Sequence, residues 1–372
     1  MKIKLEEFLP KLTLAKKVVN AKPIIEVMGS FYLHTRDGLL YVNASDVENT
    51  VSVSVKPTEY SEMNVCVNAN DFHTALSNLK SGEVEFELNH NMKVIRCKYN
   101  SGFFQIPFDD DPNSCAALEI QAQDYTLEKD ITDAFDFSLA LTKAQIAASE
   151  ENLRPVLCGI HLDMRQDGIV AVACDKHKLS KYKTTITLDG DVSGFIMQRK
   201  SANLLVSLIA ESEGDGVTMR VGDRSVCFVG DGFTLSSRLT EGVYPNYAVL
   251  IPEKSAYTAV VSRNTLLSAI HHVSLMKSAI DEMLIFNFDN DNILIEAEDI
   301  NFKKKAKENV PCAYSGEPMR LGIKSGNVTM ILQAIDSDEV EIRFDSPQRP
   351  ILFIPKDDDN RLLTLCMPMM CN

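Results

Sequence analysis

The sequence of 372 residues lacks three features that each mark a class of protein. It has no apolar stretch near the roughly 20 residues that a membrane helix needs, and its start, Met1–Glu7, lacks the apolar core of a signal peptide. Its nine cysteines include no Cys-x-x-Cys pair of the kind that binds zinc or carries redox chemistry. We therefore expect a soluble, cytoplasmic chain with reduced thiols, no metal ion and no other cofactor.

Positive charge is also scarce, because 38 Lys and Arg against 52 Asp and Glu give a net charge of −14. Neutralisation of phosphates by Lys and Arg dominates nucleic-acid affinity, so composition alone argues against DNA binding. That argument loses force if the cations gather on one surface, since local potential controls an encounter. A hydrophobic content of 45% excludes a mainly disordered chain, and the length allows two to four domains.

Two independent landmarks recur three times along the chain. One is a tight-turn pair followed by a strand that ends in Ala-x-Asp, and its alanines, at 44, 173 and 297, lie 129 and 124 residues apart. The other is a short helix-period run followed by strict alternation from Val84, Val217 and Val340, which lie 133 and 123 residues apart. Both intervals are near one third of the chain. We therefore predict three homologous domains, at 1–125, 126–252 and 253–372.

Each repeat mixes helical and strand patterns, which predicts the α+β class. Helical spacing is shown by Leu5, Phe8, Leu9 and Leu12, and again by Leu266, Ile270 and Val273. The alternating strands, and hairpin pairs such as Asp37-Gly38 and Asp167-Gly168, predict antiparallel sheets with helices covering one face.

Three details concern the helix ends. Pro10 is expected to disturb the first helix. Thr142 with Gln145 is expected to form a capping box at the first helix of the middle repeat, and Ser262 to cap its counterpart in the third.

Three segments match one family in order and spacing. Tyr244–Pro252 has an aromatic-Pro and a hydrophobic-Pro at its two ends, Ala173–Ser180 matches an Ala-Thr-Asp-Gly-His-Arg-Leu-Ala segment, and Met367–Met370 matches a terminal Met-Pro-Met-Arg-Leu. With these segments the whole chain resembles the bacterial DNA polymerase III beta sliding clamps. It departs from the family at Lys176 and Cys174, which replace Gly and Thr, and in its last residues.

The resemblance implies a non-enzymatic processivity factor of DNA replication with no catalytic residue and no metal. Its three DNA-clamp domains would each carry antiparallel sheets outside and two helices inside, in a head-to-tail homodimeric ring around duplex DNA. The ring would bind DNA without reading its sequence. A groove between domains 2 and 3 would hold short peptides of the DNA polymerase III alpha subunit, the clamp loader and other proteins with a clamp-binding motif.

The resemblance also implies three sets of site residues. The peptide groove would comprise Arg154, Leu157, Cys174, Lys176, His177, Lys178, Leu179, Pro245, Val249, Leu250, Ser346, Met367, Pro368, Met369 and Met370. The DNA contacts would be Lys22, Glu151, Arg199 and Lys200. The dimer interface would comprise Phe104, Ile106, Leu275 and Met276.

Two other hypotheses stay open on the residues alone. The runs Asp109–Asp111 and Asp357–Asp359 could hold Mg²⁺ in a nuclease, although no phosphate-binding loop or catalytic pair accompanies them and solvated acidic loops are the simpler interpretation. A monomeric scaffold could keep the peptide groove without closing into a ring. Without the resemblance, Met367 and Met369 would be assigned to a terminal strand in its own core.

Overall fold

The computed structural model describes residues 1–80, 82–121, 123–151, 153–188, 192–212, 214–357 and 360–371. The chain forms two compact units: unit 1 comprises Met1–Ser138 and Lys200–Leu239, and unit 2 comprises Leu139–Arg199 and Thr240–Asn372. In the described residues each unit is built on one 12-stranded sheet with antiparallel neighbours. The division between the units passes through the middle repeat, so each unit combines one terminal repeat with part of the middle one.

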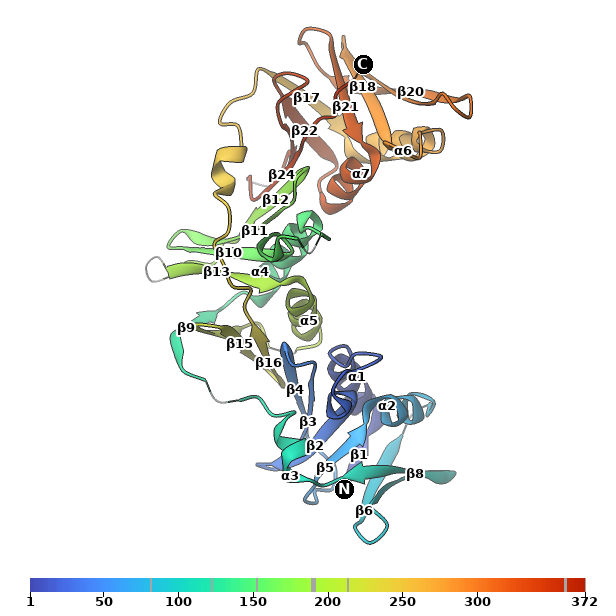
Figure 1. Ribbon diagram of the computed structural model, residues 1–372, viewed down its shortest axis with the longest axis vertical. Helices are drawn as coiled ribbons and strands as arrows, with labels where there is room; N and C mark the ends of the chain where they lie inside the picture. The colour runs from blue at the N-terminus through green and yellow to red at the C-terminus, as the bar shows by residue number, and fades with distance from the viewer. Residues whose placement is uncertain are drawn as a thin grey trace. The chain divides into compact units, whose positions relative to one another are not determined.

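Unit 1 has a sheet that runs from the N-terminal strand to the strand before the middle helices. Its order is β1 (Lys2–Lys4), β6 (Glu83–Asn89), β7 (Val94–Tyr99), β8 (Gly102–Asp109), β5 (Asn64–Asn68), β2 (Ser30–Arg36), β3 (Leu39–Ser45), β4 (Asn49–Val55), β16 (Phe233–Arg238), β15 (Ser225–Gly230), β14 (Val217–Gly222) and β9 (Tyr125–Ile131). Its helical segments are α1 (Leu5–Lys16), η1 (Glu26–Gly29), α2 (Ala69–Ser77) and α3 (Pro112–Ala116). Helices α1 and α2 lie side by side (Figure 1).

Unit 2 repeats this arrangement. Its sheet order is β13 (Val192–Gln198), β10 (Gly159–Arg165), β11 (Gly168–Cys174), β12 (Lys178–Lys183), β24 (Leu362–Cys366), β23 (Ile351–Pro355), β22 (Glu339–Phe344), β17 (Tyr257–Ser262), β20 (Lys304–Ala313), β19 (Asn292–Asp299), β18 (Met283–Asp289) and β21 (Met319–Lys324). Its helical segments are η2 (Gln145–Ala147), η3 (Pro155–Leu157), η4 (Tyr247–Leu250), α6 (Arg263–Ser274) and α7 (Ser325–Ala334). Two further helices, α4 (Ala134–Ala144) and α5 (Arg199–Ala210), include residues of both units.

The predicted alternation appears as three equivalent strands, β6, β14 and β22. A buried valine is the first residue of β14 and the second residue of β6 and β22. The first hairpin turn is the one predicted: Asp37 and Gly38 both have positive φ, 52° and 80°, which matches the twist of the flanking strands. In the second hairpin Arg165 pairs with Gly168, so the turn residues are Gln166 and Asp167. The glycine begins the next strand.

Two of the three helix-end predictions were wrong. Helix α1 continues through Pro10, and its buried face of Leu5, Phe8 and Leu12 packs into the core of unit 1. Thr142 lies inside α4 instead of at its start, where Asp133 accepts a hydrogen bond from the backbone N–H of Asp136 at 2.8 Å. Packing of an apolar face determines a helix more strongly than local signals do.

The third prediction was correct. Ser262 precedes α6, and its hydroxyl accepts a hydrogen bond from the backbone N–H of Thr265 at 3.4 Å. Among the described residues no helix is long and apolar enough to cross a membrane.

Each sheet contains one pairing between strands of different repeats, which we call its joint. In the unit 1 joint β4 pairs with β16, and Thr50 lies opposite Ser236. In the unit 2 joint β12 pairs with β24, and Leu179 lies opposite Leu365. Both joints are antiparallel. In each joint the fourth strand of one repeat, β4 or β12, pairs with the last strand of the next repeat, β16 or β24. The internal repeat is therefore visible in backbone pairing as well as in sequence.

Candidate functional site

The turn between β11 and β12 presents charged residues at one end of the unit 2 joint. The Asp175 carboxylate accepts the backbone N–H groups of His177 and Lys178 at 2.7 and 2.8 Å, and it also pairs with the Lys178 ammonium. This turn leaves Lys176 and His177 exposed, and Lys176 forms an ion pair with Glu151 at 2.7 Å. The hydrogen bond and charge of Lys176 lower the pKa of the Glu151 carboxyl.

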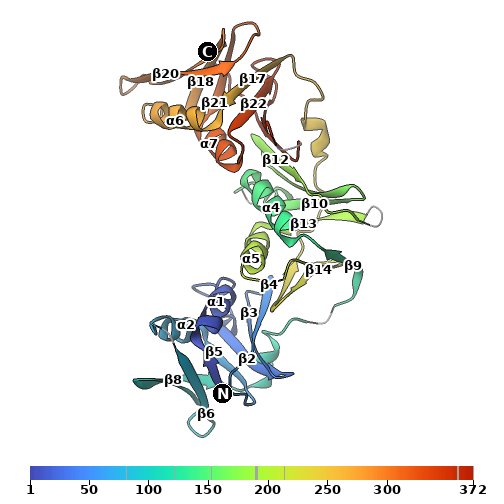
Figure 2. The same ribbon diagram turned by 180° about the vertical axis from the view of Figure 1, so that it is seen from behind.

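The segment after β16, from Thr240 to the start of β17, is fixed to the same repeat by two tyrosines. The Tyr244 hydroxyl accepts the backbone N–H of Cys174 at 2.9 Å, and its ring stacks on His161 with centroids 4.9 Å apart. The Tyr247 hydroxyl donates to the Asp163 carboxylate at 2.8 Å. Figures 1 and 2 both show this segment, with η4, on the side of unit 2 away from α6 and α7.

The electrostatics of this attachment favour neutral rings. Burial raises the pKa of both Tyr244 and Tyr247, so their hydroxyls remain donors. Burial also lowers the pKa of His161. Burial alone would raise the pKa of Asp163, but hydrogen bonds from Arg165 and Tyr247 outweigh it and lower that pKa. These contacts attach η4 to the middle repeat, and its Val249 and Leu250 are 76% and 45% exposed.

The C-terminal segment crosses the joint and reaches β21. The backbone N–H of Met367 donates to the His177 carbonyl at 2.8 Å, and that of Met369 donates to the Gly322 carbonyl at 2.7 Å. A Cβ on Gly322 would come within 2.7 Å of the Met369 carbonyl oxygen, so this approach requires glycine. Figure 1 places the C-terminus beside β18 and β21. The terminal methionines are therefore held partly buried, except Met370, which is exposed.

Together these parts enclose a cavity of about 590 Å³ in unit 2. The lining residues are Asp175, Lys176, Lys178, Leu179, Val249, Leu250, Pro252, Arg349, Pro350, Leu365 and Met367. Beneath it lies a buried core that includes Leu157, Cys174, Tyr244 and Leu352. We call this cavity and its rim the groove. An apolar floor with exposed aliphatic walls is the arrangement of a site that takes an apolar side chain from a partner.

The structure brings six of the predicted groove residues together as lining of this cavity. These are Lys176, Lys178, Leu179, Val249, Leu250 and Met367. Leu157 and Cys174 belong to the core below it. The others lie outside the lining: Arg154, His177, Pro245, Ser346, Pro368, Met369 and Met370.

Five lining residues were missed by the sequence analysis: Asp175, Pro252, Arg349, Pro350 and Leu365. Leu365 could have been found, because it continues the alternation of the last strand next to the terminal motif. Arg349 and Pro350 come from the loop between β22 and β23, whose position depends on how the third repeat pairs with the middle one. No local pattern indicates that position.

Three of the four predicted DNA-contact residues have partners within the chain. Glu151 pairs with Lys176, and Arg199 lies 3.6 Å from the Glu150 carboxylate. The Lys200 ammonium pairs with the almost buried Asp46 carboxylate and donates to the Val18 carbonyl at 3.1 Å. Lys22 is exposed in the segment between α1 and η1.

The predicted interface residues lie in two places, within strand β8 and just after helix α6. Phe104 is half-buried and Ile106 is buried on β8, while the adjacent Phe103 is 56% exposed. Leu275 and Met276 directly follow α6, and Leu275 is 73% exposed.

The first acidic run is engaged locally. Asp111 caps the short helix α3 by accepting from the backbone N–H of Asn113 at 3.3 Å, and Asp109 accepts from the N–H of Asp111 at 3.0 Å. Asp110 forms an ion pair with Lys93 at 2.8 Å. In the second run Asp358 and Asp359 lie outside the described residues. Within the described ranges no three His, Cys, Asp or Glu side chains converge as metal ligands.

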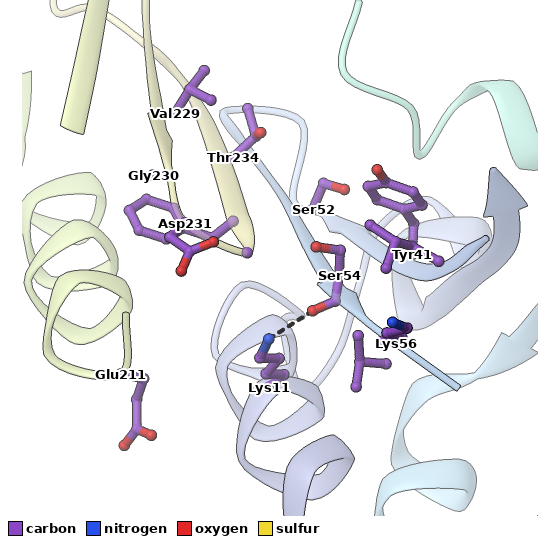
Figure 3. Close-up of a pocket in the computed structure, with 14 residues that line it drawn as sticks. Lys11, Tyr41, Ser52, Ser54, Lys56, Glu211, Val229, Gly230, Asp231 and Thr234 are labelled. Carbon is purple, nitrogen blue, oxygen red and sulfur yellow. Dashed lines mark hydrogen bonds between the residues drawn. The ribbon is translucent and has the colours of Figure 1, made fainter. Parts of the chain in front are cut away.

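A second cavity, of about 520 Å³, lies in unit 1 at the end of β4 and the β15–β16 turn (Figure 3). Figure 3 shows the Lys11 ammonium donating to the Ser54 carbonyl, at 2.8 Å, with Glu211 and Asp231 on the other side. Both cavities are lined by side chains of both charges, but this one also carries hydroxyl groups, which the lining of the groove lacks.

Comparison with known proteins covers nearly the whole chain. Models of the DNA polymerase III beta subunit match residues 1–111 as the N-terminal domain, 133–246 as the central domain and 248–370 as the C-terminal domain. The beta sliding clamp of Treponema pallidum is 24% identical over 376 residues, which are 98% of this chain and 97% of that protein.

Solved structures agree on the fold. The DNA polymerase sliding clamp from Pseudomonas aeruginosa has a TM-score of 0.91 at 19% identity, and the DNA polymerase III beta subunit from Thermotoga maritima a TM-score of 0.90 at 20% identity. Each comparison covers 100% of this chain and 99% of the other. With all three domain models matched in order, the chain belongs to the DNA polymerase III beta subunit family, the bacterial beta sliding clamps.

Proposed function

We propose that two copies of this chain close head to tail into a ring around duplex DNA and tether a polymerase to it through the groove. Membership of the family gives the chain the role of a sliding clamp in DNA replication. The observation that supports the ring is a pair of strand edges without a backbone partner among the described residues. These edges are the sides of β8 and β20 that face away from β7 and β19.

The two edges are the counterparts of the strands in the internal joints. β8 pairs with β7 over Gly102–Pro107 and meets β5 only at Phe108 and Asp109. β20 pairs with β19 over Lys304–Pro311 and meets β17 only at Cys312 and Ala313. Exposed edges of this kind invite pairing with another chain. A chain with three repeats forms two such joints internally, and pairing β20 with β8 of a second copy supplies the third at both ends of the dimer.

The internal joints predict the register of this pairing. One position common to the three repeats is held by Thr50, Leu179 and Lys305. Each of them lies opposite the residue before the Asp of the repeated Ala-x-Asp motif. A second common position is held by Ser236, Leu365 and Gln105. Each is reached by following the paired residues across β15, β23 or β7 from the third residue after the first valine of β14, β22 or β6. Since Thr50 pairs with Ser236 and Leu179 with Leu365, Lys305 should pair with Gln105 of the second copy. Exposed Phe103 would then lie opposite Lys307.

The DNA contact we propose is modest. A closed ring is linked to DNA topologically, so it needs few phosphate contacts and reads no bases. Of the four predicted contacts, exposed Lys22 is the best placed for a phosphate. Lys200 holds Asp46 and the end of α1 in unit 1, so we assign it first to stability.

The groove would receive short peptides of the DNA polymerase III alpha subunit, the clamp loader and other clamp-binding proteins, because its exposed Val249 and Leu250 offer apolar contact. The protein would act in the cytoplasm without a metal or cofactor and would catalyse no reaction. The domain boundaries would be 1–125, 126–252 and 253–372.

Light scattering with absolute mass is the test of closure. We expect twice the mass of one chain for the wild type, and a monomer after Leu275→Glu with Met276→Glu. A chain with Gln105→Cys and Lys305→Cys should form a disulfide between copies under mild oxidation, because residues directly opposite in antiparallel strands have Cα atoms about 4.5–5.5 Å apart, within the range that a disulfide spans. Gln105→Cys with Asn309→Cys is the register control, and the parent chain controls for native thiols.

The outcomes separate the alternatives. A wild type that stays monomeric at micromolar concentration supports the scaffold hypothesis and overturns the ring. Mg²⁺-dependent cleavage of DNA that is lost in Asp110→Asn would favour a nuclease. Disulfide formation in the control pair and not in the Lys305 pair would contradict the register.

A further inference from the structure

Two of the nine cysteines lie against each other in unit 1. The Sγ atoms of Cys66, on β5, and Cys115, on α3, are 3.3 Å apart, and both side chains are buried. The two residues are 49 positions apart in the chain. We propose that they form a reversible oxidation site, at which a small disulfide such as glutathione disulfide converts them to an intramolecular disulfide that fixes α3 to β5. This site is independent of the ring and of the groove.

The end of β8 and the turn after it bring Cys115 over Cys66. Cys66 lies directly opposite Asp109, the last residue of β8. The Asp109 carboxylate accepts the backbone N–H of Asp111 at 3.0 Å, and Asp111 caps α3. The backbone N–H of Cys115 donates to the Asp111 carbonyl at 3.1 Å. The first acidic run therefore builds the turn that sets one thiol against the other.

Apolar side chains enclose the two thiols. Tyr32 and Leu118 are buried beside them, and the partly buried Val27 and Met28 pack against the same cluster. Figures 1 and 2 both show α3 on the side of the first repeat away from α1 and α2. The thiols thus belong to a small cluster under α3, and access to them depends on that helix.

Burial keeps both thiols protonated while α3 is closed. It raises the pKa of Cys66 and of Cys115, and nearby carboxylates raise the pKa of Cys115 further. A cysteine attacks a disulfide as the thiolate, so oxidation requires that one of the two reach water. Helix α3 has five residues, and so short a helix is marginal without its packing. Cys115 therefore becomes reactive when α3 opens, whereas Cys66 stays on β5, between β8 and β2.

The reaction consists of two exchange steps. The Cys115 thiolate attacks one sulfur of glutathione disulfide, which forms a mixed disulfide and releases one glutathione thiolate. As α3 returns, the Cys66 thiol loses its proton, attacks the Cys115 sulfur and releases the second glutathione. The two cysteines lose two protons and two electrons, and the oxidant takes up both as two glutathione thiols. Disulfide sulfurs are about 2.0 Å apart, so the pair must approach by about 1.3 Å, which rotation of the two side chains can supply.

The experiment incubates the full chain at a fixed glutathione concentration with increasing glutathione disulfide, alkylates the free thiols and maps the peptides by mass spectrometry. We expect one linked peptide that joins Cys66 to Cys115, and a reductant should reverse the link completely. The link should form at a roughly tenfold lower concentration of glutathione disulfide than a glutathione adduct on Cys115 in Cys66→Ala, because the second thiol is already in place.

Variants assign the link to this pair. Cys66→Ala and Cys115→Ala should each abolish it. Cys97→Ala is the matched control, because Cys97 is another buried thiol of the first repeat, on β7, and this variant should form the link as the wild type does.

Hydrogen exchange of the wild type tests the opening step without any variant. In the reduced chain the backbone N–H groups of Cys115 and Leu118 should exchange at least roughly tenfold faster than those of β5, because α3 opens locally. The disulfide should remove most of this difference.

Three results would overturn the proposal. The first is that Cys66 and Cys115 stay open to alkylation at every concentration of glutathione disulfide, or that the links join other cysteines. The second is separate glutathione adducts on both residues without a link, which would mean that the two sulfurs do not meet. The third is equal exchange of the α3 and β5 amides in the reduced chain, which would mean that α3 does not open on its own.

Discussion

The two joints share a backbone pattern and differ in the side chains at one end. In unit 1 this end is filled by a polar network in which Asn49 accepts the hydroxyls of Ser201 and Ser237 at 2.6 and 2.8 Å. In unit 2 the positions that match Asn49 and Ser237 are Lys178 and Cys366, next to the pair of Leu179 and Leu365, and the groove opens there. Backbone pairing therefore determines where a groove can form in this protein, and side chains determine whether one forms.

The same contrast extends to the next position along the joint. Arg238 in unit 1 and Met367 in unit 2 each donate a backbone N–H across the joint, to Glu48 and His177 respectively, at 2.8 Å. The arginine side chain reaches the Glu48 carboxylate at 3.7 Å, while the methionine lines the groove. The unit 2 joint thus borders the groove, and the unit 1 joint is a closed polar seam.

The largest expected effect is on the apolar joint. Leu365→Ala removes a leucine that is 3% exposed and should destabilise unit 2 by about 2–5 kcal/mol, because a cavity remains where its side chain packed. Differential scanning calorimetry measures the shift of the transition. The control is Leu250→Ala, which is 45% exposed and should change stability by less than about 1 kcal/mol. Similar losses in both variants would mean that the joint is not a packed core.

The polar joint should respond less. Asn49→Ala leaves the buried hydroxyls of Ser201 and Ser237 without their shared acceptor and should cost about 1–3 kcal/mol. Thermal unfolding measures it, with the exposed Asn91→Ala as the control. Adding Ser201→Ala and Ser237→Ala to Asn49→Ala should recover part of the loss, since the unpaired groups are then gone. A further loss of the same size would contradict the network.

A smaller, pH-dependent effect is expected from the support of the groove in unit 2. His161 is stacked on Tyr244, its Nδ1 has no hydrogen-bond partner within the described residues, and burial lowers its pKa. The unfolded chain takes up the proton near pH 6.5, so below that pH the unfolded state binds more protons and stability falls as pH decreases.

The measurement is the melting temperature between pH 7.5 and 5. His161→Phe keeps an aromatic ring and should flatten the slope, whereas exposed His177→Phe should leave it unchanged. Part of the slope should persist in His161→Phe, because burial also lowers the pKa of His34 in unit 1. If His161→Phe leaves the slope unchanged, His161 is not a cause of the pH dependence of the melting temperature.

The smallest effect is expected from exchanging a side chain between the joints. Arg238→Met gives unit 1 the residue that unit 2 has at this place, and it removes an ion pair whose partners are 52% and 41% exposed. Such pairs contribute little, so the melting temperature should change by the equivalent of less than about 1 kcal/mol. A loss above about 2 kcal/mol would show that the seam of unit 1 depends on this pair. Arg220→Gln, which removes another exposed pair, is the reference.

The sequence by itself determined the three repeats, the α+β class and the antiparallel strands, because periodicities of two and 3.6 residues are local consequences of burying one face. Its resemblance to the family also predicted Lys176, Lys178, Leu179 and Met367 as groove residues, and these four line the cavity. It misplaced the start of α4 and one hairpin turn, since several nearby residues could serve as cap or turn and packing selects among them.

Only the tertiary structure decided which residues meet at the joints. Arg349 and Leu365 become neighbours of Val249 in one cavity because β24 pairs with β12, nearly two hundred residues away in the chain. It also decided that Lys200 and Glu151 have partners within the chain, although both were candidates for DNA contact. Long-range pairing depends on whole strands and not on a local pattern. Whether a charged side chain has an ion-pair partner within the chain depends on which neighbours that pairing brings to it.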